Sequence, residues 1–276
     1  MRDALIVSVL SLIPRNHVTR VLGWCARWRL PAFLERWLLA WFIRHYRVNT
    51  DELEMPVSAY PSLEAFFTRR LKDGARPLCP DKDAVVSPAD AVLVAAGRVC
   101  RDRIPQSGSQ MVDVRRLLGG DHPFEGGAYA VLYLSPPDYH RVHSPVAGAV
   151  ARWHYVPGTL FPVFRASAER VENLFARNER LVTWLDTAVG RVALVMVGAF
   201  GVGRITTPYM NLVTNTGGRE TDVEPDKPPT FDKGAEIGCF HLGSTVILFF
   251  EPDKVQIETA VGKKVKVNAR IGGVVG

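Results

Sequence analysis

The sequence predicts an α+β protein in which N-terminal membrane-associated helices precede a mainly antiparallel β core, built as a barrel-like sheet or a sandwich. The first 50 residues are apolar and rich in arginine and tryptophan, with helical spacing. From residue 84 onward, short β-type runs alternate with glycines and prolines. The 276 residues, 47% of them hydrophobic, suffice for one large core. The net charge of +6 indicates an anionic partner, either a lipid surface or a nucleic acid.

The N-terminal segment 4–13 is almost wholly apolar, but its uncharged run ends before Arg15. That length is below the ~20 residues that a helix needs to cross a bilayer, so we expect no transmembrane helix here. Arg2 and Asp3 stand together at the start and no small-residue cleavage site follows, which disfavours a secretory signal peptide.

Two further helices are expected before residue 50. One starts near Asn16, and the next opens with Pro31 in its first turn. The latter carries an apolar stripe made of Leu34, Trp37, Leu38, Trp41 and Phe42. Tryptophans and arginines gather across both helices, at Trp24, Trp28, Trp37, Trp41, Arg20, Arg27, Arg29, Arg36 and Arg44. This composition favours a membrane-interfacial helical region over residues 1–50, and the alternative is a helical hairpin buried against the main domain.

A β-rich domain is expected over residues 51–276, beginning with a proline-punctuated connector that contains one short helical stretch at 62–72. The predicted strands are 92–95, 129–134, 146–153, 192–197, 246–250 and 265–269. Two Ser-Pro pairs, at 87–88 and 144–145, each enter a small-residue strand. This echo indicates either two related hairpins or a chance repeat.

Metal and disulfide sites are poorly supported. The cysteines Cys25, Cys79, Cys100 and Cys239 are widely spaced, which argues against a zinc site or a disulfide framework and favours a reducing compartment. His140 and His143 lie three residues apart, but the prolines around them make the segment a loop rather than a helix. A metal site there is possible only with further ligands that the sequence does not identify.

Three loops at the edges of the predicted β core hold the reactive side chains. They contain Asp90, the pair His140 and His143, and Ser244. A carboxylate, an imidazole and a hydroxyl are the components of an activated serine, in which the base removes the hydroxyl proton and the acid orients the base. Ser244 follows Gly243 at the start of a strand, so it can attack its own preceding carbonyl. On local sequence alone, a polar turn and hydrogen-bonding loop histidines are the alternatives.

Seven segments together resemble the bacterial pyruvoyl-dependent phosphatidylserine decarboxylases. Residues 241–245 read HLGST and are similar to the L-G-S-T processing site of that family. The others follow in the family's order: 66–72 (FFTRRLK), 75–77 (ARP), 87–90 (SPAD), 138–145 (DYHRVHSP), 178–180 (NER) and 233–238 (KGAEIG). The resemblance runs from about residue 62 to the C-terminus. Ala91 departs from it, because the family commonly has glycine after the aspartate.

The resemblance implies that the chain cuts itself. His143, oriented by Asp90, would deprotonate Ser244, whose oxygen attacks the Gly243 carbonyl and forms an ester. Elimination would then separate a large chain, 1–243, from a small chain, 244–276. The dehydroalanine left at position 244 would hydrolyse to a covalent pyruvoyl group, the enzyme's cofactor, and no metal is implied.

The implied reaction is decarboxylation of phosphatidylserine to phosphatidylethanolamine through a Schiff base between the pyruvoyl group and the headgroup amine. His140 would be the proton donor or a headgroup contact. The implied partners are the anionic phospholipid and the membrane surface, with no nucleic acid. The two chains would form a heterodimer, with further oligomerisation left open. The implied location is the cytoplasmic side of the inner membrane, as a peripheral protein.

Two other functions remain open from the residues alone. A serine hydrolase could use Asp90, His143 and Ser244 without cutting its own chain, although Ser244 lacks the G-x-S-x-G elbow that usually presents such a nucleophile. A noncatalytic, membrane-associated β module is the second alternative.

Overall fold

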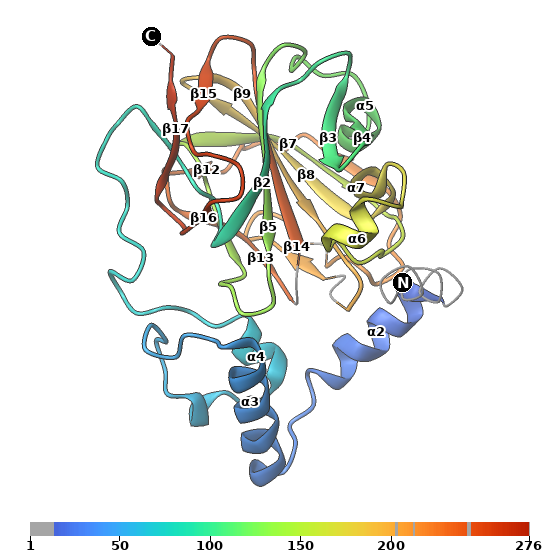
Figure 1. Ribbon diagram of the computed structural model, residues 1–276, viewed down its shortest axis with the longest axis vertical. Coiled ribbons are helices and arrows are strands. Elements are labelled where there is room, and N and C mark those ends of the chain that lie inside the picture. The colour runs from blue at the N-terminus through green and yellow to red at the C-terminus, as the bar shows by residue number, and fades with distance from the viewer. Residues whose placement is uncertain (1–13, 202–203, 212, 242–243, 276) are drawn as a thin grey trace.

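The computed structural model describes residues 14–201, 204–211, 213–241 and 244–275 (Figure 1). Two predicted features lie outside the described residues: the apolar segment 4–13 and Gly243, on the upstream side of the predicted cleavage bond. The described chain is mixed α and β, with paired strands that are antiparallel throughout its named sheets. The predicted fold class is confirmed at this level.

The predicted helices form close to their expected positions. They are α2 (Arg15–Cys25), α3 (Ala32–Tyr46) and α4 (Leu63–Phe67), with a short 3₁₀ turn η1 (Val57–Ala59) before α4. Pro31 precedes α3 as its N-cap residue, and Arg47 ends the helix in the left-handed conformation. Ser62 caps α4 by accepting a hydrogen bond from the Ala65 N–H at 3.2 Å. Among the described helices, none has the length and apolar character to cross a bilayer.

The remaining elements build the β core. The first group is β1 (Ala84–Val86), β2 (Ala91–Arg98), β3 (Arg103–Ser107), β4 (Gln110–Asp113), α5 (Val114–Leu118) and β5 (Ala128–Leu134). The second is β6 (Arg141–His143), β7 (Gly148–Val156), α6 (Arg165–Ala168), α7 (Leu174–Arg177), β8 (Arg180–Thr187) and β9 (Gly190–Val197). The third is β10 (Ile205–Thr206), β11 (Thr221–Val223), β12 (Thr230–Phe231), β13 (Glu236–Phe240), β14 (Ser244–Phe250), β15 (Val255–Ile257), β16 (Lys264–Val265) and β17 (Arg270–Val274).

One large sheet organises the core. Its strand order is β11-β7-β8-β9-β14-β5-β2-β16, with β12 also paired to β7. The strand β14 lies inside this sheet and pairs with β5 on one side and with β9 on the other. Every residue of β14 is buried. The C-terminal part of the chain is therefore integral to the core.

Apolar layers cover both faces of the large sheet. Side chains alternate along β14, so Val246 and Leu248 join one hydrophobic cluster and Ile247 and Phe249 join the other. The first cluster includes residues of the small sheets β10-β13-β6 and β1-β17-β15. The second includes residues of β3, β4, α5 and α7. Both faces are buried, which explains why β14 is a continuous apolar run rather than an alternating one.

The prediction of a barrel-like core is wrong, because the large sheet is open. Its described path ends at β16 on one side and near β11 and β12 on the other, and no described pairing joins these ends. The edge strands are short, with two residues in β16 and three in β11. Part of the predicted strand 265–269 leaves the sheet, since the Val267 N–H donates to the Asp90 carboxylate instead of a neighbouring strand.

The two Ser-Pro turns form a symmetrical pair. The hydroxyls of Ser87 and Ser144 each donate to the carbonyl two residues ahead, both at 2.7 Å. The turns also bond to each other, since the Val86 N–H donates to the Pro145 carbonyl and the His143 N–H donates to the Pro88 carbonyl. The sequence echo therefore corresponds to two related turns that pack against each other.

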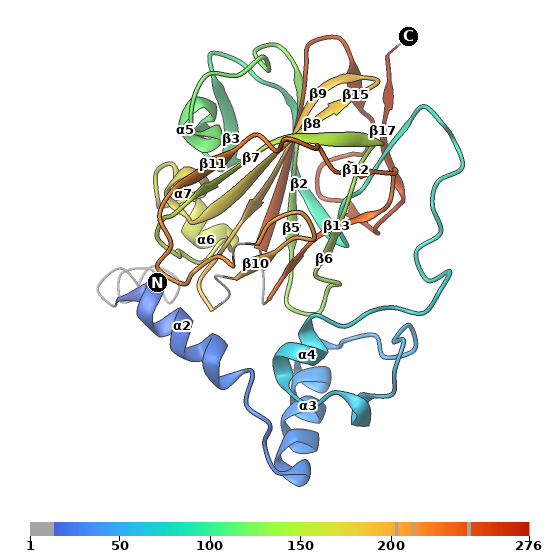
Figure 2. The same ribbon diagram turned by 180° about the vertical axis from the view of Figure 1, so that it is seen from behind.

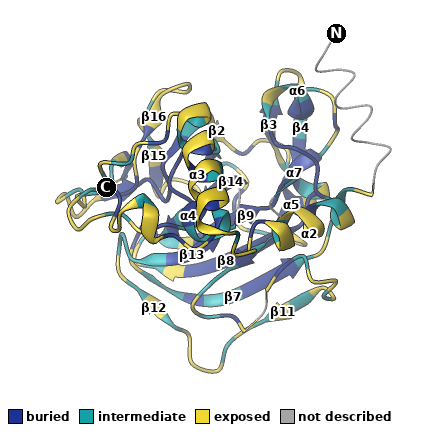
Figure 3. Cartoon of the chain, turned by 90° about the horizontal axis from the view of Figure 1, so that it is seen from below, coloured by how far each residue is buried: buried dark blue, intermediate teal, exposed yellow. Residues whose placement is uncertain are grey.

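The helices α2, α3 and α4 lie at one end of the β core, near β6, β10 and β13 (Figures 1 and 2). Residues of α3 and α4 share a small hydrophobic cluster that includes Leu39, Phe42, Phe66 and Phe67. The helix α2 contacts the core through Thr19, whose hydroxyl accepts a hydrogen bond from the Gly201 N–H at 3.1 Å. Much of α3 is nevertheless exposed, whereas β14 is buried (Figure 3).

Two adjacent residues of β2 test the layered core. Leu93 is fully buried and Val94 is 39% exposed. Leu93→Ala should lower the free energy of unfolding by about 2–5 kcal/mol because it leaves a cavity, whereas Val94→Ala should cost under about 1 kcal/mol. Urea unfolding followed by circular dichroism measures both, and equal losses for the two variants would contradict this assignment of faces.

Candidate active site

Ser244 is the first residue of β14, directly opposite Leu134 at the end of β5. It is fully buried, and its hydroxyl has no hydrogen-bond partner within the described residues. A buried hydroxyl normally has a partner, because leaving one unpaired costs about 1–3 kcal/mol. Within the described part of the chain, the Ser244 hydroxyl is therefore not committed to a structural hydrogen bond.

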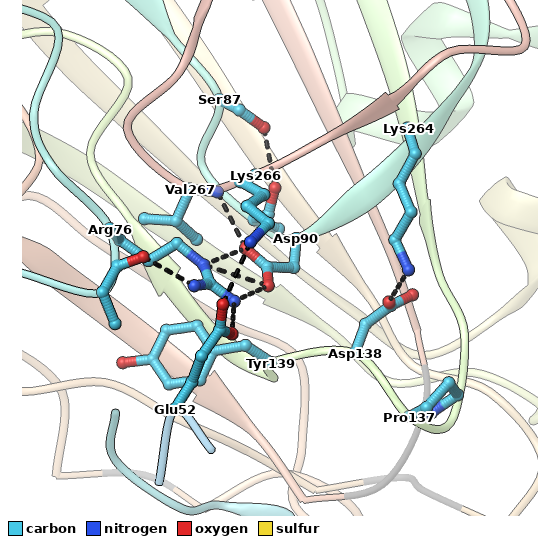
Figure 4. A network of polar contacts seen from close by, with 12 residues as sticks. Glu52, Arg76, Ser87, Asp90, Pro137, Asp138, Tyr139, Lys264, Lys266 and Val267 are labelled. Atoms are coloured by element: carbon cyan, nitrogen blue, oxygen red, sulfur yellow. Dashed lines mark hydrogen bonds and ion pairs between the residues drawn. The ribbon is translucent and has the colours of Figure 1, made fainter. Parts of the chain in front are cut away.

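Asp90 lies just before β2, where it is held by a cation and by a backbone donor (Figure 4). The Arg76 Nε donates to Asp90 Oδ1 at 2.8 Å, and Arg76 Nη2 donates to Asp90 Oδ2. The Val267 N–H also donates to Oδ1 at 2.8 Å. Arg76 is bound in turn by Glu52, from the segment after α3. This bidentate ion pair fixes the carboxylate in one orientation.

His143 is the last residue of β6, and both ring nitrogens have partners. Its Nδ1 lies 2.8 Å from the Gly234 carbonyl, so Nδ1 carries the proton and donates. Its Nε2 lies 3.4 Å from the Tyr139 hydroxyl and is the unprotonated nitrogen. Burial lowers the pKa of His143. The ring is therefore a neutral base with its lone pair on Nε2.

The structure brings the Asp90 and His143 loops together without joining the two side chains. The His143 N–H bonds to Pro88, two residues before Asp90. Gly234, rather than Asp90, accepts the bond from His143 Nδ1. Among the described residues, no hydrogen bond connects Ser244 with either side chain. Asp90 and His143 thus lie on neighbouring turns, and the three predicted residues form no bonded triad among the described residues.

His140 is fully buried and directly precedes β6. Its Nδ1 donates to the Asp138 carbonyl at 2.8 Å, and its Nε2 has no partner within the described residues. The Phe240 N–H donates to the His140 carbonyl, so His140 lies beside the end of β13. Phe240 is four residues before Ser244 in the chain. Burial, with a smaller contribution from the Arg69 charge, lowers the pKa of His140 to about 3. The imidazole is therefore neutral near pH 7.

Arg69 and Arg141 connect the helical region to the histidine loop. Arg69 is buried, and its Nη2 donates to the carbonyls of Pro137 at 2.7 Å and Asp138 at 3.0 Å. Arg141 donates to the Thr68 carbonyl at 3.0 Å and to Glu236 at 2.7 Å. The segment after α4 therefore fixes the loop that carries both histidines.

Sequence reasoning assigned no role to three groups that shape this site: Arg76, Tyr139 and the Gly234 carbonyl. Arg76 had a usable signal, because a buried carboxylate such as Asp90 requires a compensating cation. Tyr139 adjoins His140 in the sequence and could have been included on proximity. The sequence could not indicate the Gly234 carbonyl, because every residue has a backbone carbonyl and only the tertiary structure shows which one lies beside His143.

The pKa of His140 gives a test in an uncleaved Ser244→Ala chain. Unfolding exposes the ring and restores a pKa near 6.5, so the unfolded state binds more protons below that pH. The stability contributed by neutral His140 should be complete above about pH 6.5 and should fall as pH decreases toward 3. Urea titrations at pH 7 and pH 5 should show a smaller loss in His140→Gln than in the parent.

The exposed His17→Gln substitution controls for removal of an imidazole elsewhere. Identical pH dependence in the parent and in His140→Gln would contradict the buried neutral assignment.

Comparisons with known proteins identify the family. The phosphatidylserine decarboxylase family profile matches residues 63–273. A phosphatidylserine decarboxylase proenzyme from Stutzerimonas stutzeri is 43% identical, covering 95% of this chain and 91% of that protein. Proteins of the same name are 41% identical in an Anaeromyxobacter species, covering 99% of both chains, and 38% identical in Brevibacillus brevis, covering 95% of both. The matched region contains the turns of Asp90 and His143 and the start of β14. This chain belongs to the phosphatidylserine decarboxylase family.

Proposed function

We propose that this protein decarboxylates phosphatidylserine to phosphatidylethanolamine, using a pyruvoyl group that it makes by cleaving its own Gly243-Ser244 bond. The relatives carry the name proenzyme, which supports processing of the chain. The observation that carries the proposal is the buried, unpaired Ser244 hydroxyl at the first position of β14. A serine committed to a structural hydrogen bond would be a poor nucleophile, and no hydrogen-bond partner of the Ser244 hydroxyl lies among the described residues.

The surroundings of Ser244 fit a pyruvoyl group at this position. The group would replace a side chain that has no hydrogen-bond partner in the part of the chain that the structure describes, so conversion removes no described hydrogen bond. The following strand keeps the residue in place through its pairings with β5 and β9. Burial also excludes bulk water from a reactive ketone.

Cleavage requires a base, and His143 supplies one in this proposal. The neutral Nε2 takes the proton from Ser244 Oγ as Oγ attacks the Gly243 carbonyl, which converts the amide into an ester. Elimination then leaves a carboxylate on Gly243 and dehydroalanine at position 244, and one water converts the latter into pyruvoyl and ammonia. His143 must turn from Tyr139 toward Ser244 for the first step. Asp90 stabilises the resulting imidazolium through its negative charge.

In the second reaction, the pyruvoyl ketone supplies an electrophile for the headgroup amine and an electron sink for the pair released with carbon dioxide. The Nε2 of His140 has no partner among the described residues, and burial lowers the pKa of the ring to about 3, which supports a hydrogen bond to the headgroup amine more than a role as a resident acid. Arg69 holds this ring in place by binding the carbonyls of Pro137 and Asp138.

The two products of cleavage would remain together as a heterodimer. The small chain would keep β14 between two strands of the large chain, and β17 paired with β1. It would also keep the Val267 bond to Asp90 and the ion pair of Lys266 with Glu52 at 3.0 Å. In this proposal residues 51–276 form the catalytic domain, and residues 1–50 serve as its interfacial region.

Membrane association is supported by the surface of α2 and α3. The exposed apolar side chains of α2, α3 and the loop between them are Val21, Leu22, Trp24, Trp28, Phe33, Leu34, Trp37 and Trp41. Five exposed arginines accompany them: Arg20, Arg27, Arg29, Arg36 and Arg44. Tryptophan with arginine suits the boundary between lipid headgroups and acyl chains. We place the protein peripherally on the cytoplasmic side of the inner membrane, where its free cysteines would remain reduced.

Ser244→Ala tests the cleavage. This variant should remain one chain and lack decarboxylase activity, whereas the parent should yield two fragments on a denaturing gel. Ser107→Ala, in the β3 hairpin, removes a hydroxyl far along the chain and should cleave as the parent does. Cleavage of Ser244→Ala at the same bond would refute the proposal. A parent chain that stays whole yet hydrolyses esters would favour the serine hydrolase.

Trp37 and Trp41 test the membrane-facing surface. Replacing both with serine should weaken binding to vesicles containing phosphatidylserine by about tenfold or more, because their apolar area no longer enters the lipid. Leu78→Ser, at an exposed position outside the helices, is the control. Vesicle sedimentation measures the bound fraction, and unchanged binding of the double variant would contradict this surface.

A further inference from the structure

A cationic pocket lies between α2 and the segment that leads to Ser244. Its volume is 410 Å³, within the range typical of small-molecule sites. One wall is α2, through Arg20, Gly23 and Trp24, and the opposite wall includes Arg204 and His241. The described loop residues 213–216 also line it. The pocket thus combines a helix of the proposed membrane-facing region with a residue three positions before Ser244.

The charges of this pocket are unbalanced. Three arginines line it, Arg20, Arg27 and Arg204, against one carboxylate, Glu64. The Glu64 Oε1 lies 3.4 Å from Arg204 Nη1 and 3.2 Å from His241 Nδ1. Within the described residues, no carboxylate lies within 4.0 Å of Arg20 or Arg27. The Arg204 Nε is also buried without a described hydrogen-bond partner. The Arg27 Nε donates to the Gly23 carbonyl at 3.2 Å, and the charge of Arg20 acts on the buried Glu179. An anion in the pocket would supply an acceptor for Arg204 Nε and charge-assisted bonds to the remaining N–H groups.

The pocket also has free space on the helix side. A Cβ added to Gly23 would meet no heavy atom within 4 Å, so this glycine leaves the wall open. Trp24 beside it is 52% exposed, as expected for a side chain at a membrane interface. The chain from His241 to Ser244 spans at most about 11 Å. A group bound here therefore lies close to the reacting residue.

We infer that this pocket binds the phosphodiester of the phospholipid substrate, with Arg20, Arg27 and Arg204 as its anion ligands. The inference rests on the proposed function, because it names the part of the substrate that these residues recognise. The amine and phosphate of a serine headgroup are only a few bonds apart, which matches a phosphate pocket next to the residue that reacts with the amine. Trp24 lies where the glycerol and acyl chains leave the pocket for the bilayer.

Binding can be measured without turnover in the uncleaved Ser244→Ala chain. Glycerophosphoserine is the probe, titrated by isothermal calorimetry at low ionic strength, with inorganic phosphate and serine methyl ester in parallel. Glycerophosphoserine should bind and serine methyl ester should not. The double substitution Arg20→Gln with Arg27→Gln should weaken binding by about tenfold or more, because charge-assisted bonds are lost.

Two further variants separate a pocket from general electrostatics. Gly23→Leu keeps every charge and should also weaken binding, because its side chain fills the open space. Arg101→Gln with Arg103→Gln removes two exposed arginines from the β core and should leave binding unchanged. Equal weakening by both arginine pairs, or full binding by Gly23→Leu, would overturn the inference. Binding of inorganic phosphate without glycerophosphoserine would also overturn it, since it would indicate a site for free phosphate.

The cleaved enzyme gives the second readout. The pocket variants should cleave normally and should raise KM for phosphatidylserine about tenfold with little change in kcat. An unchanged KM in a cleaved and active variant would overturn the phosphate pocket alone. A parent protein that cleaves but does not decarboxylate phosphatidylserine would instead refute the proposed function.

Discussion

The double pairing of β14 is the constraint on which the rest of this structure depends. The strand contributes to both hydrophobic clusters and is bonded along its length to β5 and β9. Ser244 therefore has a fixed position at the first residue of a strand that cannot move without opening the core. This arrangement would let the chain be cut immediately before β14 while the fold stays intact, because the strand is held by its neighbours rather than by Gly243.

Hydrogen bonds and an ion pair hold the turns that carry Asp90 and His143. The paired Ser-Pro turns bring the backbone of His143 next to that of Pro88, and the Arg76 ion pair fixes Asp90 nearby. The side chains of Asp90 and His143 are nevertheless bonded to other groups. The turns that carry Asp90 and His143 are therefore neighbours, and the proposed cleavage still requires His143 to rotate toward Ser244. Such a requirement would delay cleavage until the core has folded around the loop.

The sequence predicted α2, α3 and five of the six strand positions because these segments have clear helical spacing or dense β-branched runs. It did not predict the open sheet, since closure depends on which edges meet, and it overextended β16 because Val267 bonds to a side chain. Asp90, His143 and Ser244 were predicted as site residues from residue chemistry and family motifs, and they remain predictions. Their actual partners, Arg76, Gly234 and the unpaired environment of Ser244, required tertiary structure.

In the proposed function, Ser244 becomes an electrophile at the N-terminus of the small chain. The most direct measurement is the intact mass of the small fragment under denaturing conditions. We expect a fragment of residues 244–276 that is lighter by one ammonia than the same peptide with an N-terminal serine, and that is blocked to N-terminal sequencing. A fragment beginning with unmodified serine, or a chain that remains whole in the active enzyme, would contradict it.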